Sequence, residues 1–137
     1  MILVDTGPLV ALFDPRDGRH RRCWDVLETL REPLVATVPV LTEVFHLLTP
    51  SSQGADRVRD FIARRGLEVW FLDGDGLQRA FSLMDEYADH PMDLADASLI
   101  VAAEALPTRR VFTIDRRDFA SYRVRHGHRR YPVEIVG

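Results

Sequence analysis

Lysine is absent from this sequence of 137 residues, and all 18 of its Lys-or-Arg positions are arginine. The absence bears on one function class directly. A phospho-receiver domain is an α/β fold with an acidic Mg²⁺ pocket, but it needs a lysine near the phosphorylated aspartate. Without a lysine the chain does not fit that class, whatever its fold.

Cysteine is almost as scarce, since Cys23 is the only one. One cysteine cannot form an internal disulfide or a cysteine metal cluster, so we expect Cys23 to be a small buried hydrophobe. The five histidines show no zinc-ligand spacing with it. No Gly-x-Ser-x-Gly nucleophile elbow is present either.

Long apolar runs are missing as well, so no membrane-crossing segment is expected. The first residues carry an acid at Asp5 and no basic segment before it, which does not fit a signal peptide. A cytoplasmic location is therefore the expectation. With 46% apolar and 28% charged residues, the composition predicts one globular domain over residues 1–137.

Charge is unevenly distributed along the chain. The formal net charge is −3, yet residues 109–137 hold eight arginines against the acids Asp115, Asp118 and Glu134. This basic segment is either a solvated arginine-rich face or a surface that contacts phosphates, and the sequence leaves both open.

The stretch that organises the chain is the first one, where Met1 to Val4 run into Asp5, Thr6, Gly7 and Pro8. An apolar run bounded by a turn signal is typical of a strand buried on both faces. Gly7 permits a sharp turn and Pro8 suits a helix start. Asp5 is therefore predicted at the carboxyl end of a buried strand, the edge where α/β sheets bind ligands.

Strands and helices are predicted to alternate along the rest of the chain. Apolar runs predict further strands over 34–37, 67–72, 110–114 and 132–136, and apolar periodicity predicts helices over 9–13, 19–31, 40–48, 56–65, 74–87 and 93–105. Gly66 is the expected C′ residue of the fourth helix. A helical turn is expected around 118–122. This alternation indicates a parallel sheet with helices on both faces.

Acidic residues occur where structure alone explains them poorly. Asp115 ends a second buried strand, so it should share a rim with Asp5. Glu43 and Asp96 lie within apolar helices, where an unpaired acid is costly. Asp93 lies one turn before Asp96. Three of these acids have simpler interpretations: Glu43 as a first-turn acid, Asp93 as a helix N-cap or first-turn acid, and Asp115 as an N-cap. Asp118 has the same alternative as a surface or capping residue.

The joint pattern favours a shared site. Carboxylates about 4 Å apart repel by ~1 kcal/mol in water and by more where the dielectric constant is lower. Such a cluster raises its own pKa values or recruits a cation. All-oxygen ligands suit Mg²⁺ or Mn²⁺, which can activate water and offset charge on a phosphodiester.

With these residues in view, the chain resembles a PIN-domain ribonuclease, specifically a VapC toxin of a type II toxin–antitoxin pair. Four segments carry the resemblance: Val4–Leu12, Leu41–Val44, Met92–Ile100 and Phe112–Phe119. Because their order and spacing fit the family as well, the resemblance extends over essentially the whole chain. The resemblance implies a PIN-like three-layer α/β/α sandwich with a parallel sheet of about five strands.

The resemblance also implies roles for individual residues. Asp5, Glu43 and Asp96 match the family's acidic triad, and Asp115 matches a more variable fourth acid. Asp5, Asp96 and Asp115 would hold Mg²⁺ or Mn²⁺, and Asp93 and Asp118 are secondary metal candidates. Thr6 and Thr113 match small hydroxyl positions that support the metal shell.

The implied activity is metal-dependent endoribonuclease cleavage of RNA, with tRNA or rRNA as candidate targets. Glu43 would orient or deprotonate the attacking water, and Arg116 and Arg117 would contact flanking phosphates. The implied partners are a VapB-like antitoxin and a second copy of the chain. A housekeeping RNA-processing nuclease and a catalytically inactive PIN binding module remain the alternatives.

Overall fold

The computed structural model describes residues 1–137 and centres on a parallel sheet of five strands. The spatial order is β3-β2-β1-β4-β7, with every neighbouring pair parallel. The strands are β1 (Ile2–Val4), β2 (Leu34–Thr37), β3 (Glu68–Trp70), β4 (Arg110–Phe112) and β7 (Glu134–Val136). The predicted fold class, a parallel sheet of about five strands between helices, is therefore confirmed.

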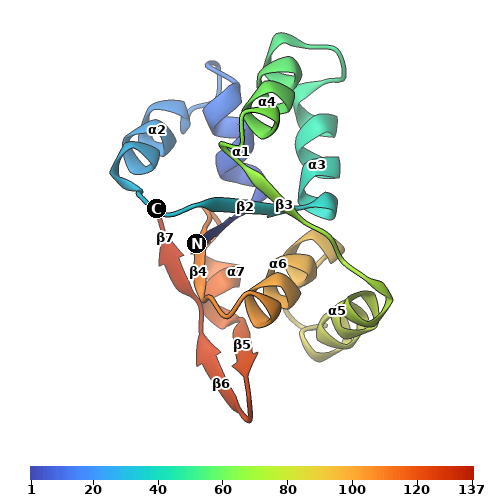
Figure 1. Cartoon of the computed structure of the whole chain (residues 1–137). Coiled ribbons are helices and arrows are strands. Elements are labelled where there is room, and N and C mark those ends of the chain that lie inside the picture. Colours follow the sequence, from blue (N-terminus) through green and yellow to red (C-terminus); the bar gives the residue numbers. More distant parts are fainter.

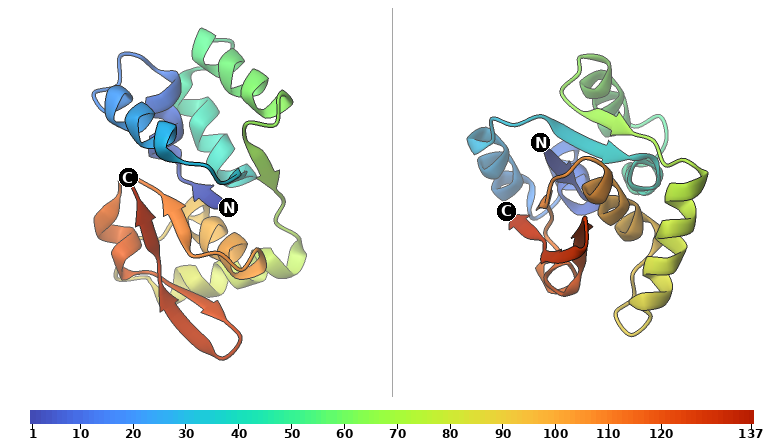
Figure 2. Two further views of the ribbon diagram at one scale, coloured as in Figure 1. Left: turned by 60° about the vertical axis from the view of Figure 1, so that its left-hand side comes forward. Right: turned by 60° about the horizontal axis from the view of Figure 1, so that its bottom comes forward.

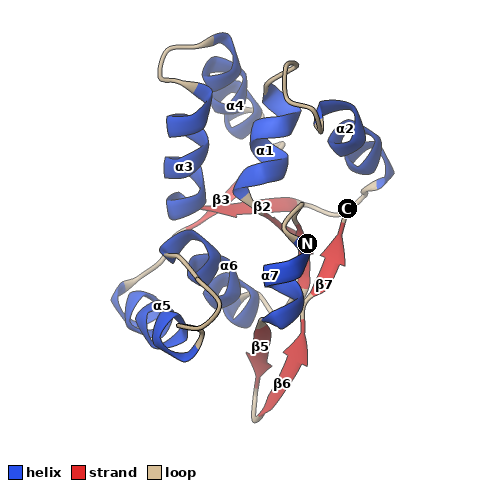
Figure 3. Cartoon of the chain, turned by 180° about the vertical axis from the view of Figure 1, so that it is seen from behind, coloured by secondary structure: helices blue, strands red, loops and turns tan.

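Helices cover both faces of this sheet. They are α1 (Thr6–Phe13), α2 (His20–Thr29), α3 (Val38–Leu48), α4 (Gln53–Ala63), α5 (Gly74–Glu86), α6 (Leu94–Ala105) and α7 (Arg116–Ser121). Figure 1 shows α1 to α4 on one side of the sheet and α5, α6 and α7 on the other. The view from behind in Figure 3 shows the same three layers.

The winding of the chain reverses next to the central strand. From β1 the chain moves outward through β2 to β3, and then returns past the other face to place β4 on the opposite side of β1. The β1–β4 boundary is thus the topological switch point of the sheet, where a crevice forms at the carboxyl ends of the strands. Asp5 and Asp115 follow the two strands that form this boundary.

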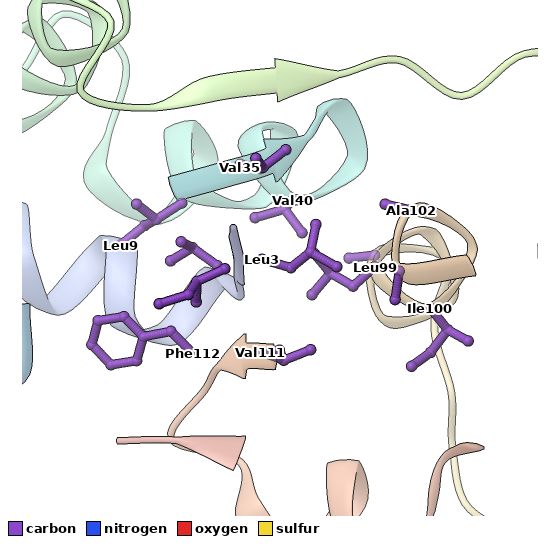
Figure 4. Packing of buried hydrophobic residues seen from close by; sticks show 14 of the residues in the cluster. Leu3, Leu9, Val35, Val40, Leu99, Ile100, Ala102, Val111 and Phe112 are labelled. Carbon is purple, nitrogen blue, oxygen red and sulfur yellow. The ribbon is translucent and has the colours of Figure 1, made fainter. Parts of the chain in front are cut away.

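The central strand is buried on both faces, as its apolar run predicted. All three residues of β1 have no exposed surface. Figure 4 shows Leu3 in the middle of the core, with Leu9 of α1 on one side and Leu99 of α6 on the other. Cys23 is free and buried in the same core, which confirms its predicted role.

Two local predictions were wrong. The helix predicted over 56–65 begins at Gln53, because the Ser52 hydroxyl caps it by accepting from the Ala55 amide at 3.1 Å. Its left-handed terminal residue is Arg65, with φ of 62°, and not Gly66. Gly66 instead lies against the Phe61 ring, where a Cβ atom would overlap it.

A hairpin near the carboxyl end was also missed. β5 (Arg123–His126) and β6 (Arg129–Pro132) pair antiparallel outside the main sheet, so the last sheet strand begins at Glu134 and not at 132. Figure 2 shows this hairpin projecting beyond the sheet. The polar sequence of these strands carries little apolar alternation, which is the signal that marks a half-buried strand. No helix of the structure has the length and apolar character needed to cross a bilayer.

The first turn of α4 packs tightly against the end of α1. A Cβ atom on Gly54 would lie 2.7 Å from the Phe13 carbonyl oxygen, whereas one on Gly74, in the first turn of α5, would meet nothing within 4 Å. Gly54→Ala should therefore lower the free energy of unfolding by about 1–3 kcal/mol through overpacking. Gly74→Ala should leave it equal or higher. Urea unfolding of both variants checks this, and equal stability of the two would contradict the packing described.

Candidate functional site

Asp5 occupies the turn between β1 and α1, where the apolar run predicted it. Its Oδ1 accepts a hydrogen bond from the Thr6 amide at 2.8 Å, which caps α1. Its Oδ2 accepts from the Thr113 hydroxyl, also at 2.8 Å. Only 7% of Asp5 is exposed, so this carboxyl group is held inside the rim of the sheet.

Thr113 connects Asp5 to Asp115. Thr113 follows β4 and is fully buried, and its hydroxyl accepts from the Asp115 amide at 3.0 Å while it donates to Asp5. Asp115 is exposed and caps α7 by accepting from the Asp118 amide at 3.2 Å. The capping reading of Asp115 is therefore confirmed, and its position on the rim beside Asp5 is observed as well.

Glu43 reaches the same rim from α3. It lies beyond the first turn of that helix, which contains no acid, so the simpler reading of Glu43 as a first-turn acid is wrong. The Thr6 hydroxyl donates to Glu43 Oε1 at 2.8 Å. Thr6 thus donates to Asp5 with its amide and to Glu43 with its hydroxyl. The second carboxylate oxygen of Glu43, Oε2, has no protein donor.

Asp96 approaches from the first turn of α6. Its Oδ2 accepts from the Tyr122 hydroxyl at 3.3 Å, and its amide donates to Asp93 Oδ1 at 2.8 Å. Asp93 is the N-cap of α6 and is exposed, as one of its two readings predicted. Asp96 is half-buried, so Asp93 is the more solvent-exposed of the two acids and Asp96 lies nearer the interior.

The charges of these carboxyl groups affect one another's pKa values. Burial raises the pKa of Asp5 to about 6, and the charges of Asp115 and Asp93 add to the rise against the lowering effect of its hydrogen bonds. Burial also raises the pKa of Asp96 to about 8, followed by the charges of Asp93 and Asp5. Asp118 has a raised pKa too, first from burial and then from its contact with Asp115.

No cation in the protein compensates this cluster directly. None of the ion pairs in the structure involves Asp5, Glu43, Asp93, Asp96 or Asp115. Elsewhere in the chain several acids do pair with arginine, as Glu104 does with Arg79 at 3.0 Å. The rim is therefore a place where negative charge is concentrated without a partner.

The rim opens into a groove of about 400 Å³ between α3 and α6. Glu43 and Asp93 line it on facing sides, together with apolar and small side chains of both helices. Glu43 and Asp93 can thus be reached from this groove.

The oxygen atoms of the cluster suit a hard divalent cation by their chemistry, since Mg²⁺ and Mn²⁺ bind carboxylates and keep several waters. In the conformation described, no three Asp, Glu, His or Cys side chains are positioned to hold one ion together. The metal roles of Asp5, Asp96 and Asp115, and of Asp93 and Asp118 as secondary ligands, therefore stay predictions.

Tyr122 is a contributor that sequence patterns did not reveal. It is fully buried, and burial followed by the charge of Asp96 raises the pKa of its hydroxyl, so the group stays a donor to Asp96. Its ring packs edge-on against Phe119 and Tyr87. Tyr122 comes just after α7, in a segment without periodicity, and only the tertiary fold brings it to α6.

A second missed contact sets the spacing of the helices that carry the acids. The hydroxyls of Thr37, the N-cap of α3, and Ser98 of α6 are 2.6 Å apart and fully buried. This hydrogen bond ties the start of the Glu43 helix to the Asp96 helix.

The two arginines predicted to contact RNA point to different places. Arg116 donates to the Gly137 carbonyl and lines a small pocket that includes Thr113. Arg117 lies close enough to Asp118 for its charge to lower that carboxyl's pKa, against the larger raising effects. Both are exposed.

Comparisons with known proteins agree on one family and one fold. The sequence pattern of the PIN domain family matches residues 2–124. Ribonuclease VapC26 of Mycobacterium tuberculosis is 27% identical over 125 residues, which cover 89% of this chain and 92% of that protein. The M. tuberculosis VapC20 structure, described as a sarcin–ricin loop cleaving toxin, superposes with a TM-score of 0.76 at 18% identity, covering 96% of this chain and 100% of that one. A toxin–antitoxin complex from Klebsiella pneumoniae gives 0.68 at 24% identity, covering 88% and 92%.

Raised carboxyl pKa values predict how stability depends on pH. Between pH ~4 and pH ~8 the folded protein binds more protons than the unfolded chain, so the free energy of unfolding should fall as pH rises and level off above. Asp5 alone accounts for at most about 3 kcal/mol of this loss. Urea unfolding in EDTA at a series of pH values checks it. Asp96→Asn should flatten the profile and Asp75→Asn, an exposed acid of α5, should not; equal profiles for all three proteins would contradict the assignment.

Proposed function

The chain belongs to the PIN domain family, and from this premise we propose that it is an endoribonuclease that hydrolyses RNA with Mg²⁺ or Mn²⁺. We further propose that it acts as the toxin of a toxin–antitoxin pair. The relative named as a ribonuclease matches 89% of this chain over 92% of its own length, which supports the proposed activity.

One observation carries the proposal. Carboxylates from four separate segments meet at the topological switch point of the sheet, and no arginine pairs with them. A purely structural cluster of this kind would cost stability, because buried like charges repel and lose their water. The arrangement makes physical sense if a cation and a phosphate are to occupy it.

Chemical roles follow from the contacts of each acid. Asp5, Asp96 and Asp115 would supply oxygen ligands, and a bound divalent cation would polarise the scissile phosphate and offset its growing charge. Thr113 and Tyr122 hold Asp5 and Asp96 in position by donating to one oxygen of each. Because burial raises the pKa values of Asp5 and Asp96, these two carboxyl groups are partly protonated before a cation binds. Cation binding is therefore expected to release protons.

Glu43 has the arrangement expected of the group that accepts a proton from the attacking water. Thr6 holds Oε1, which leaves Oε2 without a protein donor, and Glu43 lines the groove between α3 and α6. The new bond would form between this water oxygen and phosphorus, and the bond from phosphorus to the leaving ribose oxygen would break. A base must lie within hydrogen-bond reach of the water, and a carboxylate fixed on one side meets this condition.

Partners follow from the relatives and are part of the proposal. The solved structures with this fold are described as a toxin and a toxin–antitoxin complex, which supports a VapB-like antitoxin as partner of this chain. A homodimer, which the family resemblance implies, is part of the same proposal. The substrate proposed is a structured RNA, tRNA or rRNA, since unstacked loop bases are what proteins read in RNA.

Cleavage of total bacterial RNA by the purified protein tests the activity. Wild type should cleave in Mn²⁺ or Mg²⁺ and not in EDTA. Asp5→Asn, Asp96→Asn and Glu43→Gln should each lower the rate by about 100-fold or more, because each removes a cation ligand or the proton acceptor. All should keep wild-type circular dichroism spectra.

The matched control is Asp75→Asn, which removes the same charge from the first turn of α5, away from the rim. It should cleave like wild type. Undiminished cleavage by Asp96→Asn, or by wild type in excess EDTA, would refute the proposed mechanism.

A further inference from the structure

Three arginines from distant parts of the chain line one small pocket beside the acidic rim. The pocket has a volume of about 150 Å³ and is lined by Arg19, Arg22, Thr113, Ile114, Arg116 and Gly137. Arg19 and Arg22 lie at the start of α2, and Arg116 begins α7. Figures 1 and 3 show α2 beside the end of β7, which brings these segments together.

These arginines differ from their neighbours in having no acidic partner. Arg16 pairs with Asp14 and Arg21 with Asp25, both at 3.2 Å, but Arg19, Arg22 and Arg116 form no ion pair. The side chains of Arg19 and Arg22 make no hydrogen bond within the protein either; the hydrogen bond from Arg19 to Asp17 comes from the Arg19 backbone amide. Guanidinium groups around one concave site repel each other, and an anion placed between them removes that repulsion.

The position of the pocket relative to the acids is fixed by Thr113. Its hydroxyl donates to Asp5 on the acidic side, and the same residue forms part of the wall of the arginine pocket. The basic pocket and the acidic cluster therefore adjoin at the carboxyl edge of the sheet, one residue apart. A polyanion that places one phosphate at the acids can continue along this edge toward the arginines.

We propose that this pocket binds a backbone phosphate of the RNA substrate, next to the phosphate that is cleaved; the inference rests on the proposed nuclease function. Arginine suits this ligand because its planar fork donates two parallel hydrogen bonds to phosphate oxygens. The pocket volume of about 150 Å³ accommodates one phosphate group and is smaller than the roughly 300 Å³ at which pockets for drug-sized ligands begin. The contact therefore positions the strand without reading its sequence.

RNA binding in the uncleaving Asp96→Asn background tests the pocket, with a labelled RNA oligonucleotide, EDTA and a series of KCl concentrations. Arg19→Gln with Arg22→Gln forms the test pair, since neither side chain supports the fold. Arg21→Gln with Arg31→Gln forms the control pair. The control removes the same charge in and just after α2, from side chains that do not line the pocket.

The test pair should bind RNA about tenfold more weakly than the parent protein, and the control pair within about twofold. The plot of log affinity against log salt should become less steep by about 0.7 for the test pair, the value for one lost phosphate contact on a single strand. If both pairs weakened RNA binding equally, or neither weakened it, the proposal that the pocket binds phosphate would be overturned.

Cleavage kinetics of proteins that carry the wild-type Asp96 distinguish a failure of the pocket proposal from a failure of the proposed nuclease function. The test pair should raise KM for RNA about tenfold and leave kcat within about twofold, as expected for uniform binding. A loss confined to kcat would overturn the anchoring role. If wild type itself fails to cleave RNA, the proposed function is refuted, and the binding comparison still decides whether the pocket holds phosphate.

Discussion

The hydrogen bond from Thr113 to Asp5 holds the site and the sheet together. It joins the ends of the two strands, β1 and β4, at which the winding of the chain reverses, beside a backbone bond from the Asp5 amide to the Phe112 carbonyl at 2.9 Å. Because Thr113 also accepts from the Asp115 amide, one hydroxyl fixes two acids. Thr6 extends the connection to Glu43.

Concentrated negative charge is the cost of this arrangement. The fold removes Asp5 and most of Asp96 from water and supplies hydrogen bonds from neutral groups, but no opposite charge. Charge balance comes instead from beside the cluster, where the unpaired arginines line their own pocket. A rim with acids on one side and arginines on the other matches a substrate that is itself a row of phosphates with a cation at one of them.

The fold was largely predictable because its strands are short apolar runs that end in recognisable turns. The same pattern located Asp5 and Asp115, since strand ends in a parallel sheet share an edge. Glu43 and Asp96 were recognisable as acids on apolar helices, and the structure brings both to the rim. The PIN resemblance rested on these four positions.

Other features depended on tertiary contacts that no local pattern encodes. Tyr122 reaches Asp96 only through the packing of α7 and the aromatic cluster, and Thr37 meets Ser98 across 61 positions of sequence. No local pattern marks Arg19 and Arg22 as pocket residues, because only the end of β7 and the start of α7 complete their pocket. The basic excess of residues 109–137 left a solvated face and a phosphate-contacting surface both open, and it gave no sign of the arginines on α2.

The coupling of carboxyl burial to cation binding is the central claim, and calorimetry of Mn²⁺ binding at pH 7 in buffers of different ionisation heat measures it most directly. With Asp96 mostly protonated at this pH, binding should release about one proton per ion. Asp96→Asn should abolish both the binding and the release, while Asp75→Asn retains them. Mn²⁺ binding that is unchanged in Asp96→Asn, or that proceeds without proton release in wild type, would contradict the account.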